Sequence, residues 1–234
     1  MVVFTPNSDG TAVAGFTDGG PFGDSALQCF HDVGLPASQA PSHPEEISDM
    51  VAAGDPQVFY AIDQGTQYLY HLDAQSTEIS ARFELFHTQP IAMDRDTTDG
   101  SVFIVSKYAG AVTRYDPASG LLSDYFFSDT ADGRDVAVAG SVERIFVVSQ
   151  RLIDGAFDLT SIDYGTGEII FSYPFPAASI QIDESALKLY AINNGTLYRY
   201  AIANDDLVLE QSTTIEDASD CMALSPDGQR LAVD

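Results

Sequence analysis

Two stretches that match position by position decide the fold, and the first is Ile47-Ser-Asp-Met-Val-Ala-Ala-Gly-Asp-Pro-Gln-Val-Phe-Tyr-Ala-Ile-Asp63. The second is Ala218-Ser-Asp-Cys-Met-Ala-Leu-Ser-Pro-Asp-Gly-Gln-Arg-Leu-Ala-Val-Asp234. Each has a short apolar run, a turn rich in Asp, Gly or Pro, and a second apolar run. Short apolar runs bounded by turn residues are typical of buried β-strands. The chain therefore repeats a pair of antiparallel strands.

The same pattern recurs between these two copies and before them, at a spacing of roughly 44 residues, which is in the range of propeller blades. First and second strands are predicted at 2–14, 91–105, 135–148 and 180–192. Third strands are predicted at 26–32, 68–73, 111–116, 159–163 and 196–200. Fourth strands are predicted at 78–85, 121–127, 168–173 and 207–211. The repeat thus predicts a four-stranded antiparallel unit.

We therefore predict an all-β fold, a single β-propeller domain over 1–234 with about five complete blades and the start of a sixth. The predicted blades are 1–46, 47–88, 89–133, 134–176, 177–216 and the partial 217–234. Second strands such as 102–105 are apolar on both faces, as strands between two sheets should be. First strands carry the small residues Ala52, Ala92, Ala137 and Ala223, which suit the crowded centre of a ring. Because the last unit stops after two strands, we expect a fragment of a ring with about six to eight blades.

The charge is strongly acidic: 35 Asp and Glu face 10 Lys and Arg, a net charge of −25. Such a charge repels nucleic acid and anionic lipid, and it favours cations and basic surfaces. No stretch approaches the about 20 apolar residues of a membrane span, so no membrane insertion is expected. Solubility, or adaptation to a salty medium, is an alternative reason for the acidity.

Residues 189–200 and 224–233 resemble the YVTN (YncE-like) repeats of prokaryotic, WD40-like propellers. The Tyr-Val-Thr-Asn run of that family is degenerate here, as in Val147-Val-Ser-Gln150 and Ala191-Ile-Asn-Asn194. Such repeats occur in surface-layer-type proteins, lactonase-like enzymes and cofactor-dependent enzymes. The resemblance implies a fold and no particular reaction, and it favours a bacterial or archaeal protein at the cell surface, in the periplasm or secreted.

Asp49, Asp135 and Asp220 share one register of the repeat, directly before the predicted innermost strand of the second, fourth and sixth units. Gln89 and Ala178 occupy that register in the third and fifth units. We expect this register near one mouth of the central channel, where three carboxylates would converge on a cation or a basic ligand. The alternative is that each Asp caps local backbone amides.

Asp94, Asp96 and Asp99 lie in Asp94-Arg-Asp-Thr-Thr-Asp-Gly100, where oxygen ligands surround a glycine turn as they do in calcium loops. The spacing departs from that of EF-hand loops, and the downstream Glu ligand is missing. An ordinary turn between strands is the alternative. Calcium is the one metal that the sequence suggests, and no organic cofactor is predicted.

No nucleophile elbow, phosphate-binding loop or dinucleotide fingerprint is present in the sequence. The leading hypothesis is a non-enzymatic binding or scaffold module of a larger extracytoplasmic protein. Its blade loops would present an acidic face to a protein, a small ligand or a cation, and its neighbours would include further blades of the same chain. The alternative is a propeller enzyme, a lactonase-like hydrolase or a cofactor-dependent oxidoreductase, whose site those blades complete.

Overall fold

The computed structural model describes residues 2–6, 12–16, 47–55, 57–73, 76, 78–216, 222–225 and 230–233. Nearly all regular structure is β-strand. The first strands are β1 (Val2–Pro6), β2 (Ala12–Phe16), β3 (Ile47–Ala52), β4 (Val58–Asp63), β5 (Tyr68–Asp73), β6 (Ile79–Glu84), β7 (Pro90–Arg95), β8 (Val102–Ser106), β9 (Ala111–Asp116) and β10 (Leu121–Phe126). They are followed by β11 (Ala131–Ala139), the 3₁₀ turn η1 (Gly140–Val142), β12 (Arg144–Arg151), β13 (Phe157–Asp163), β14 (Ile169–Pro174), β15 (Ser179–Asp183), β16 (Lys188–Asn193), β17 (Thr196–Ile202), β18 (Leu207–Thr214), β19 (Met222–Leu224) and β20 (Leu231–Val233).

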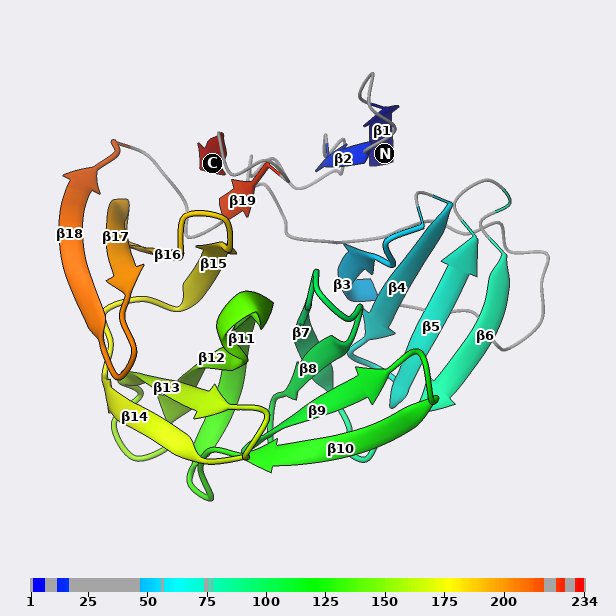
Figure 1. The fold of residues 1–234 in the computed structure, drawn as a ribbon, viewed down its shortest axis with the longest axis horizontal. Helices are drawn as coiled ribbons and strands as arrows, with labels where there is room; N and C mark the ends of the chain where they lie inside the picture. Colours follow the sequence, from blue (N-terminus) through cyan, green and yellow to red (C-terminus); the bar gives the residue numbers. More distant parts are fainter. Residues whose placement is uncertain are drawn as a thin grey trace.

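Four complete antiparallel sheets form the body of the protein, each with its four strands in chain order. They are β3–β6, β7–β10, β11–β14 and β15–β18, and two further hairpins pair β1 with β2 and β19 with β20. Figure 1 shows the four sheets arranged around a common centre, with β3, β7, β11 and β15 innermost. The predicted β-propeller architecture is confirmed. The third strand predicted at 26–32 lies outside the described residues, as does Asp220.

The core lies between neighbouring sheets. Every residue of β8 is buried, and β12 is buried from Arg144 to Ser149. Phe103 and Val105 of β8 pack with Val136 of β11 and Val147 of β12. Apolar contact on both faces of the second strand therefore joins one blade to the next, because a sheet with two buried faces needs a neighbour on each side. Within the described residues, no helix is long and apolar enough to cross a membrane.

The small residues predicted for the centre behave differently along the strand. Ala92 and Ala137 are buried on the innermost strands β7 and β11. Ala52, the last residue of β3, and Ala223, in the middle of β19, are exposed. The crowding at the centre therefore does not extend to these positions.

The two ends of the blades differ in charge. Because successive strands alternate in direction, the first-to-second and third-to-fourth connections of every blade emerge at one end, and the remaining connections emerge at the other. In the four complete blades, the first group holds nine acidic residues and no basic one: Asp55, Glu78, Asp96, Asp99, Glu143, Glu168, Glu184, Asp205 and Asp206. The second group holds only Asp129 and Asp154, with Lys107 and His87. We call these the acidic end and the apolar end.

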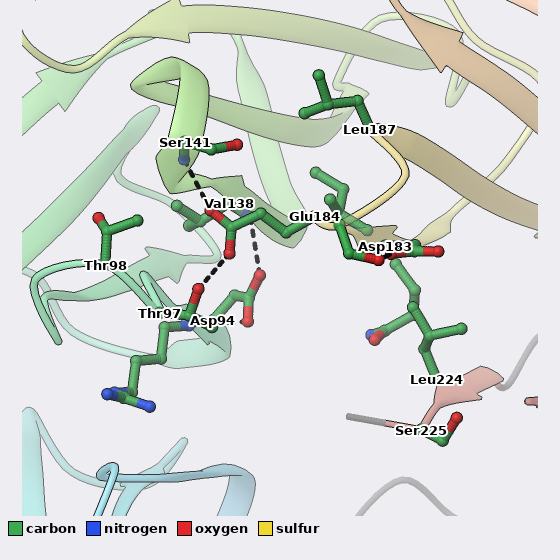
Figure 2. A pocket seen from close by; sticks show the side chains of 14 residues that line it. Asp94, Thr97, Thr98, Val138, Ser141, Asp183, Glu184, Leu187, Leu224 and Ser225 are labelled. Atoms are coloured by element: carbon green, nitrogen blue, oxygen red, sulfur yellow. Dashed lines mark hydrogen bonds between the residues drawn. The ribbon is translucent and has the colours of Figure 1, made fainter. Parts of the chain in front are cut away.

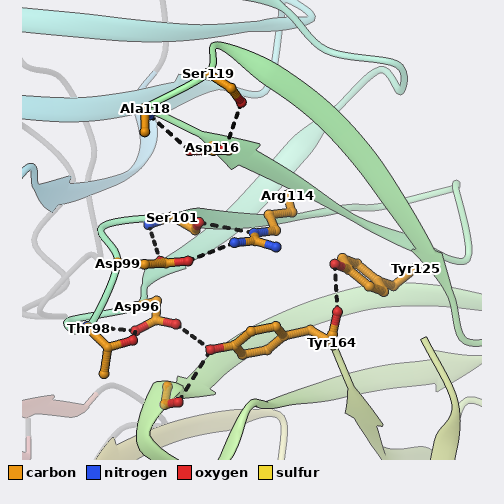
Figure 3. Close-up of polar contacts among 11 residues, drawn as sticks. Asp96, Thr98, Asp99, Ser101, Arg114, Asp116, Ala118, Ser119, Tyr125 and Tyr164 are labelled. Carbon is orange, nitrogen blue, oxygen red and sulfur yellow. Dashed lines mark hydrogen bonds and ion pairs between the residues drawn. The ribbon is translucent and has the colours of Figure 1, made fainter. Parts of the chain in front are cut away.

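Side chains at the acidic end bond one blade to the next (Figure 3). The buried Asp96, in the turn after β7, accepts a 2.5 Å hydrogen bond from the hydroxyl of Tyr164, in the turn after β13. Burial raises the pKa of Asp96, but hydrogen bonds from Thr98 and Tyr164 outweigh this effect and hold it below its ordinary value. Arg114 donates to Asp99 at 2.7 Å and lies over the ring of Tyr164. These side chains thus form a polar contact between the third and fourth blades.

Replacing Tyr164 with Phe removes the hydroxyl that satisfies the buried Asp96. We expect Tyr164→Phe to lower the free energy of unfolding by about 1–3 kcal/mol, the usual effect of leaving a buried acceptor without its donor. Urea denaturation measures this change. Tyr190→Phe is the matched control, since Tyr190 is partly exposed. Equal losses in both variants would show that the Asp96 contact does not stabilise the fold.

Candidate functional site at the acidic mouth of the channel

The innermost strands are joined by aspartate carboxylates. Each of these strands pairs with its second strand along one edge only, so the amides on its other edge need a different acceptor. The amide of Met93 on β7 donates to Asp49 Oδ2 at 2.7 Å, and the amide of Ile180 on β15 donates to Asp135 Oδ2 at 2.7 Å. Each aspartate therefore supplies an acceptor to the strand of the following blade.

The other oxygen of each aspartate stays within its own strand. Asp49 Oδ1 accepts from the amide of Met50 at 2.7 Å, and Asp135 Oδ1 accepts from the amide of Val136 at 2.9 Å. The sequence placed both residues directly before the innermost strand, whereas the structure places them inside β3 and β11. Backbone capping, the alternative reading of these residues, describes the Oδ1 bonds. Their convergence with Asp220 on a ligand stays a prediction.

Asp94 makes the same kind of bond between the third and fourth blades. Its Oδ2 accepts from the amide of Val138 on β11 at 2.8 Å, and its Oδ1 accepts from the amide of Arg95 at 2.7 Å. Gln89 occupies this register of the sequence repeat when the blades are aligned at the first residue of each innermost strand. Asp94 instead reaches the next blade from near the end of β7, and one available signal was its spacing of 44 residues from Val138.

Ionisation of Asp49 and Asp94 is energetically unfavourable in the folded protein. Burial raises the pKa of Asp49 to about 8, even though the amides of Met93 and Met50 lower it, and the charges of Asp135 and Asp94 raise it further. Burial likewise raises the pKa of Asp94 to about 7 against the amides of Val138 and Arg95, with Asp135 and Glu184 adding to the increase. The aspartates along the centre thus influence one another electrostatically.

The raised pKa of Asp49 gives a stability that depends on pH. The folded protein holds this proton more tightly than the unfolded chain, so removing it favours unfolding. The contribution of Asp49 is full below its ordinary pKa of 3.8 and is lost as the pH rises through about 8. We expect the free energy of unfolding to fall between pH 5 and 9, with a shallower slope in Asp49→Asn.

Urea denaturation across that pH range tests this expectation. The exposed Glu168 provides the control, because Glu168→Gln also removes one carboxylate and should keep the wild-type slope. The slope is the informative quantity, because Asp49→Asn also changes the hydrogen bonding at every pH. An unchanged slope in Asp49→Asn would contradict the assignment of a raised pKa.

A cavity of about 760 Å³ opens at the acidic end of the innermost strands. Its lining comes from β7, β11, β15 and β19 and from the turns that follow the first three (Figure 2). Glu184 crosses this mouth: its Oε1 accepts from the amide of Ser141 at 2.7 Å, and its Oε2 accepts from the hydroxyl of Thr97. One side chain of the fifth blade thus ties together the turns of the third and fourth blades.

The lining combines acidic, hydroxyl and apolar groups with one basic group, the guanidinium of Arg95. Asp94, Asp183 and Glu184 supply carboxylates, whereas Ile182, Leu187 and Leu224 supply apolar surface. Asp183 is held by Ser185 Oγ at 2.7 Å and by the amide of Ala186 at 3.1 Å. A cavity of this size, with mixed apolar surface and a few fixed polar groups, has the character of a ligand site. Its three carboxylates outnumber the one guanidinium of Arg95, and this excess of negative charge favours a positively charged ligand.

The residues proposed for calcium have separate partners. Asp94 binds backbone amides, Asp96 accepts from Thr98 and Tyr164, and Asp99 accepts from Ser101 and Arg114. No three His, Cys, Asp or Glu side chains gather into a metal-binding group within the part of the chain that the structure describes. The calcium site stays a prediction.

Calorimetric unfolding tests the calcium hypothesis directly. A cation that binds only the folded state raises the Tm, by an amount that grows with its concentration. The hypothesis predicts a higher Tm in calcium than in chelator and no such rise in Asp96→Asn. An identical Tm in the two solutions would contradict calcium binding at these aspartates.

No family model matches the chain, and no curated protein matches it by sequence. The chain is similar to the solved Cps50 (Swd1) β-propeller domain of Myceliophteria thermophila, with a TM-score of 0.64 and 13% identity over 80% of this chain and 66% of that one. It is also similar to Kuenenia stuttgartiensis hydrazine synthase, with a TM-score of 0.64 and 14% identity over 85% of this chain and 58% of that one.

At these identities the likeness shows the fold alone. The chain spans 66% and 58% of the lengths of the two structures. The resemblance to YVTN repeats stays a prediction. Fold, strand order and structural neighbours agree that the chain forms a β-propeller module.

Proposed function

We propose that this chain is a non-enzymatic propeller module whose acidic end binds a basic segment of a protein partner. The observation that carries the proposal is the segregation of charge: nine acidic and no basic residues occupy the connections at one end of the four complete blades. Such a surface attracts positively charged partners over long range and speeds their association. The cavity lies at the centre of this end.

The cavity suits a lysine or arginine side chain of the partner. The aliphatic stem of such a side chain would lie against Leu187 and Leu224, and its charged head would approach Glu184 and Asp94. Both carboxylates already accept hydrogen bonds from protein groups, so their positions are set before a ligand arrives. A preformed site loses little conformational entropy on binding.

The proposed setting is a larger extracytoplasmic protein, in which the module serves as a binding scaffold. Support for this setting comes from the resemblance to prokaryotic surface repeats and from the acidity of the chain. A strongly acidic surface also keeps the module soluble. The binding proposal does not depend on this setting.

A hexalysine peptide tests the proposal. We expect it to bind in isothermal titration calorimetry at low ionic strength, and we expect the affinity to fall as salt screens the charges. Glu184→Gln should weaken binding by about three- to tenfold, because it removes one charge from the cavity while keeping an acceptor for Ser141. Hexaglutamate should not bind.

Glu78→Gln is the matched control, since it removes one charge from the acidic end in a turn of the second blade that does not line the cavity. An equal loss in Glu78→Gln and Glu184→Gln would mean that the peptide senses only the net charge. An absence of hexalysine binding at low salt would overturn the proposed function altogether.

A further inference from the structure

The apolar end exposes five of the ten large hydrophobic side chains that are exposed in the described residues, including the most exposed of them. Ile153 is 92% exposed and Tyr108 is 61% exposed, each at the tip of a hairpin between a second and a third strand. Leu152 lies beside Ile153 in the same hairpin, Phe126 is the last residue of β10, and Phe86 lies in the connection after β6. Exposed apolar side chains that gather on one face mark an interaction surface more often than scattered ones do.

The segments that carry these side chains are in direct contact. Phe127 donates its amide to the carbonyl of Gly110, which joins the end of β10 to the hairpin of Tyr108. Leu152 donates its amide to the carbonyl of Thr130 at 3.2 Å, which joins the next hairpin to the same connection.

On the other side, His87 bonds Asp124 of β10 at 3.0 Å and brings the connection of Phe86 to that strand. The segments that carry the five side chains are therefore connected to one another, and we call the surface that they form the apolar face.

The distribution of charge indicates what covers this face. Two copies of a chain with a net charge of −25 repel each other most where their acidic ends approach. Between the strands of the four complete blades, the connections of the apolar end carry Asp129 and Asp154 as acids and Lys107 as a base, and the sequence after β18 adds Glu216, Asp217 and Asp220, fewer acids in all than the nine of the acidic end. Contact through the apolar ends therefore keeps the two acidic ends farthest apart.

We propose that the apolar face binds a second copy of this chain, so that two modules join with their acidic ends directed outward. A two-fold interface places the same patch on both copies, so it must be self-complementary. The apolar face meets this requirement: its hydrophobic side chains would pack against their own kind, and Lys107 of one copy would have Asp129 of the other as an acidic partner, whereas Asp154 is already paired with Arg151 of its own chain. Within its own chain, Lys107 lies over the ring of Tyr108 and forms no ion pair with a described acidic residue.

The dimer adds a property that a single module lacks. Two outward acidic ends engage two basic segments of one partner at once, which raises the apparent affinity without any new contact. The interface itself does not depend on the proposed function. A dimer that does not bind hexalysine would support the interface and contradict the proposed function. A monomer that binds hexalysine would support the proposed function and contradict the interface.

Sedimentation equilibrium over a range of protein concentrations tests the interface, at moderate salt so that the net charge is screened. We expect the wild type to have the mass of a dimer. The double variant Tyr108→Ser, Ile153→Ser should raise the dimer Kd by about tenfold or more, because exposed hydrophobic anchors carry much of the energy of such interfaces. Circular dichroism checks that the variant keeps its β structure.

The matched control is the double variant Leu121→Ser, Val208→Ser. It removes two exposed apolar side chains from outer strands, where each begins at the acidic end, and it should leave the dimer Kd unchanged. A monomeric wild type would overturn the proposal, as would a control that dissociates as readily as the Tyr108 and Ile153 variant. If the variant fails to fold, Lys107→Glu is the second test, since it weakens the dimer through charge alone.

Discussion

The hydrogen bonds that backbone amides of the innermost strands donate to aspartate carboxylates are the contact on which the centre of this protein depends. An innermost strand has neighbours on one edge only, and an unsatisfied buried amide costs about 1–3 kcal/mol. Asp49, Asp94 and Asp135 supply acceptors to the second, third and fourth junctions of the ring. Apolar packing joins the faces of the sheets, whereas these carboxylates set how the innermost strands meet.

This arrangement has an electrostatic consequence. Burial away from bulk water, with a smaller contribution from neighbouring carboxylates, disfavours ionisation and raises the pKa of Asp49 to about 8. Asp94 and Glu184 both line the cavity at one mouth of the channel. The groups that hold the blades together thus also give the mouth its acidic character. A positively charged side chain would relieve part of the repulsion among them.

The fold was largely predictable, because a repeat of strand and turn in one sequence is unambiguous when the second strand is apolar on both faces, as in 102–105. The contacts between strands of different blades could not be predicted in this way. Asp94 was predicted as a calcium ligand, but its bond to the next blade was missed because the strands were aligned at their first residues, and its partner Val138 is identified only when two blades are placed side by side.

The role of Glu184 was not predicted for the same reason, since its partner Thr97 lies 87 residues away in the sequence. Sequence periodicity describes a single blade, whereas the candidate site is built from contacts between blades. The separation of the acidic and apolar ends was open to prediction from the repeat, because strand alternation alone assigns each connection to an end. The exposed side chains of the apolar face, such as Ile153, needed the structure.

Amide hydrogen exchange by NMR tests the central claim most directly. Met93, Val138 and Ile180 donate their amides to carboxylates of the preceding blade, so these amides should exchange slowly in the wild type. In Asp94→Ala, exchange should accelerate at Val138 while Met93 and Ile180 stay protected. Fast exchange at all three amides in the wild type would contradict the account, because the carboxylates would then not hold the innermost strands together.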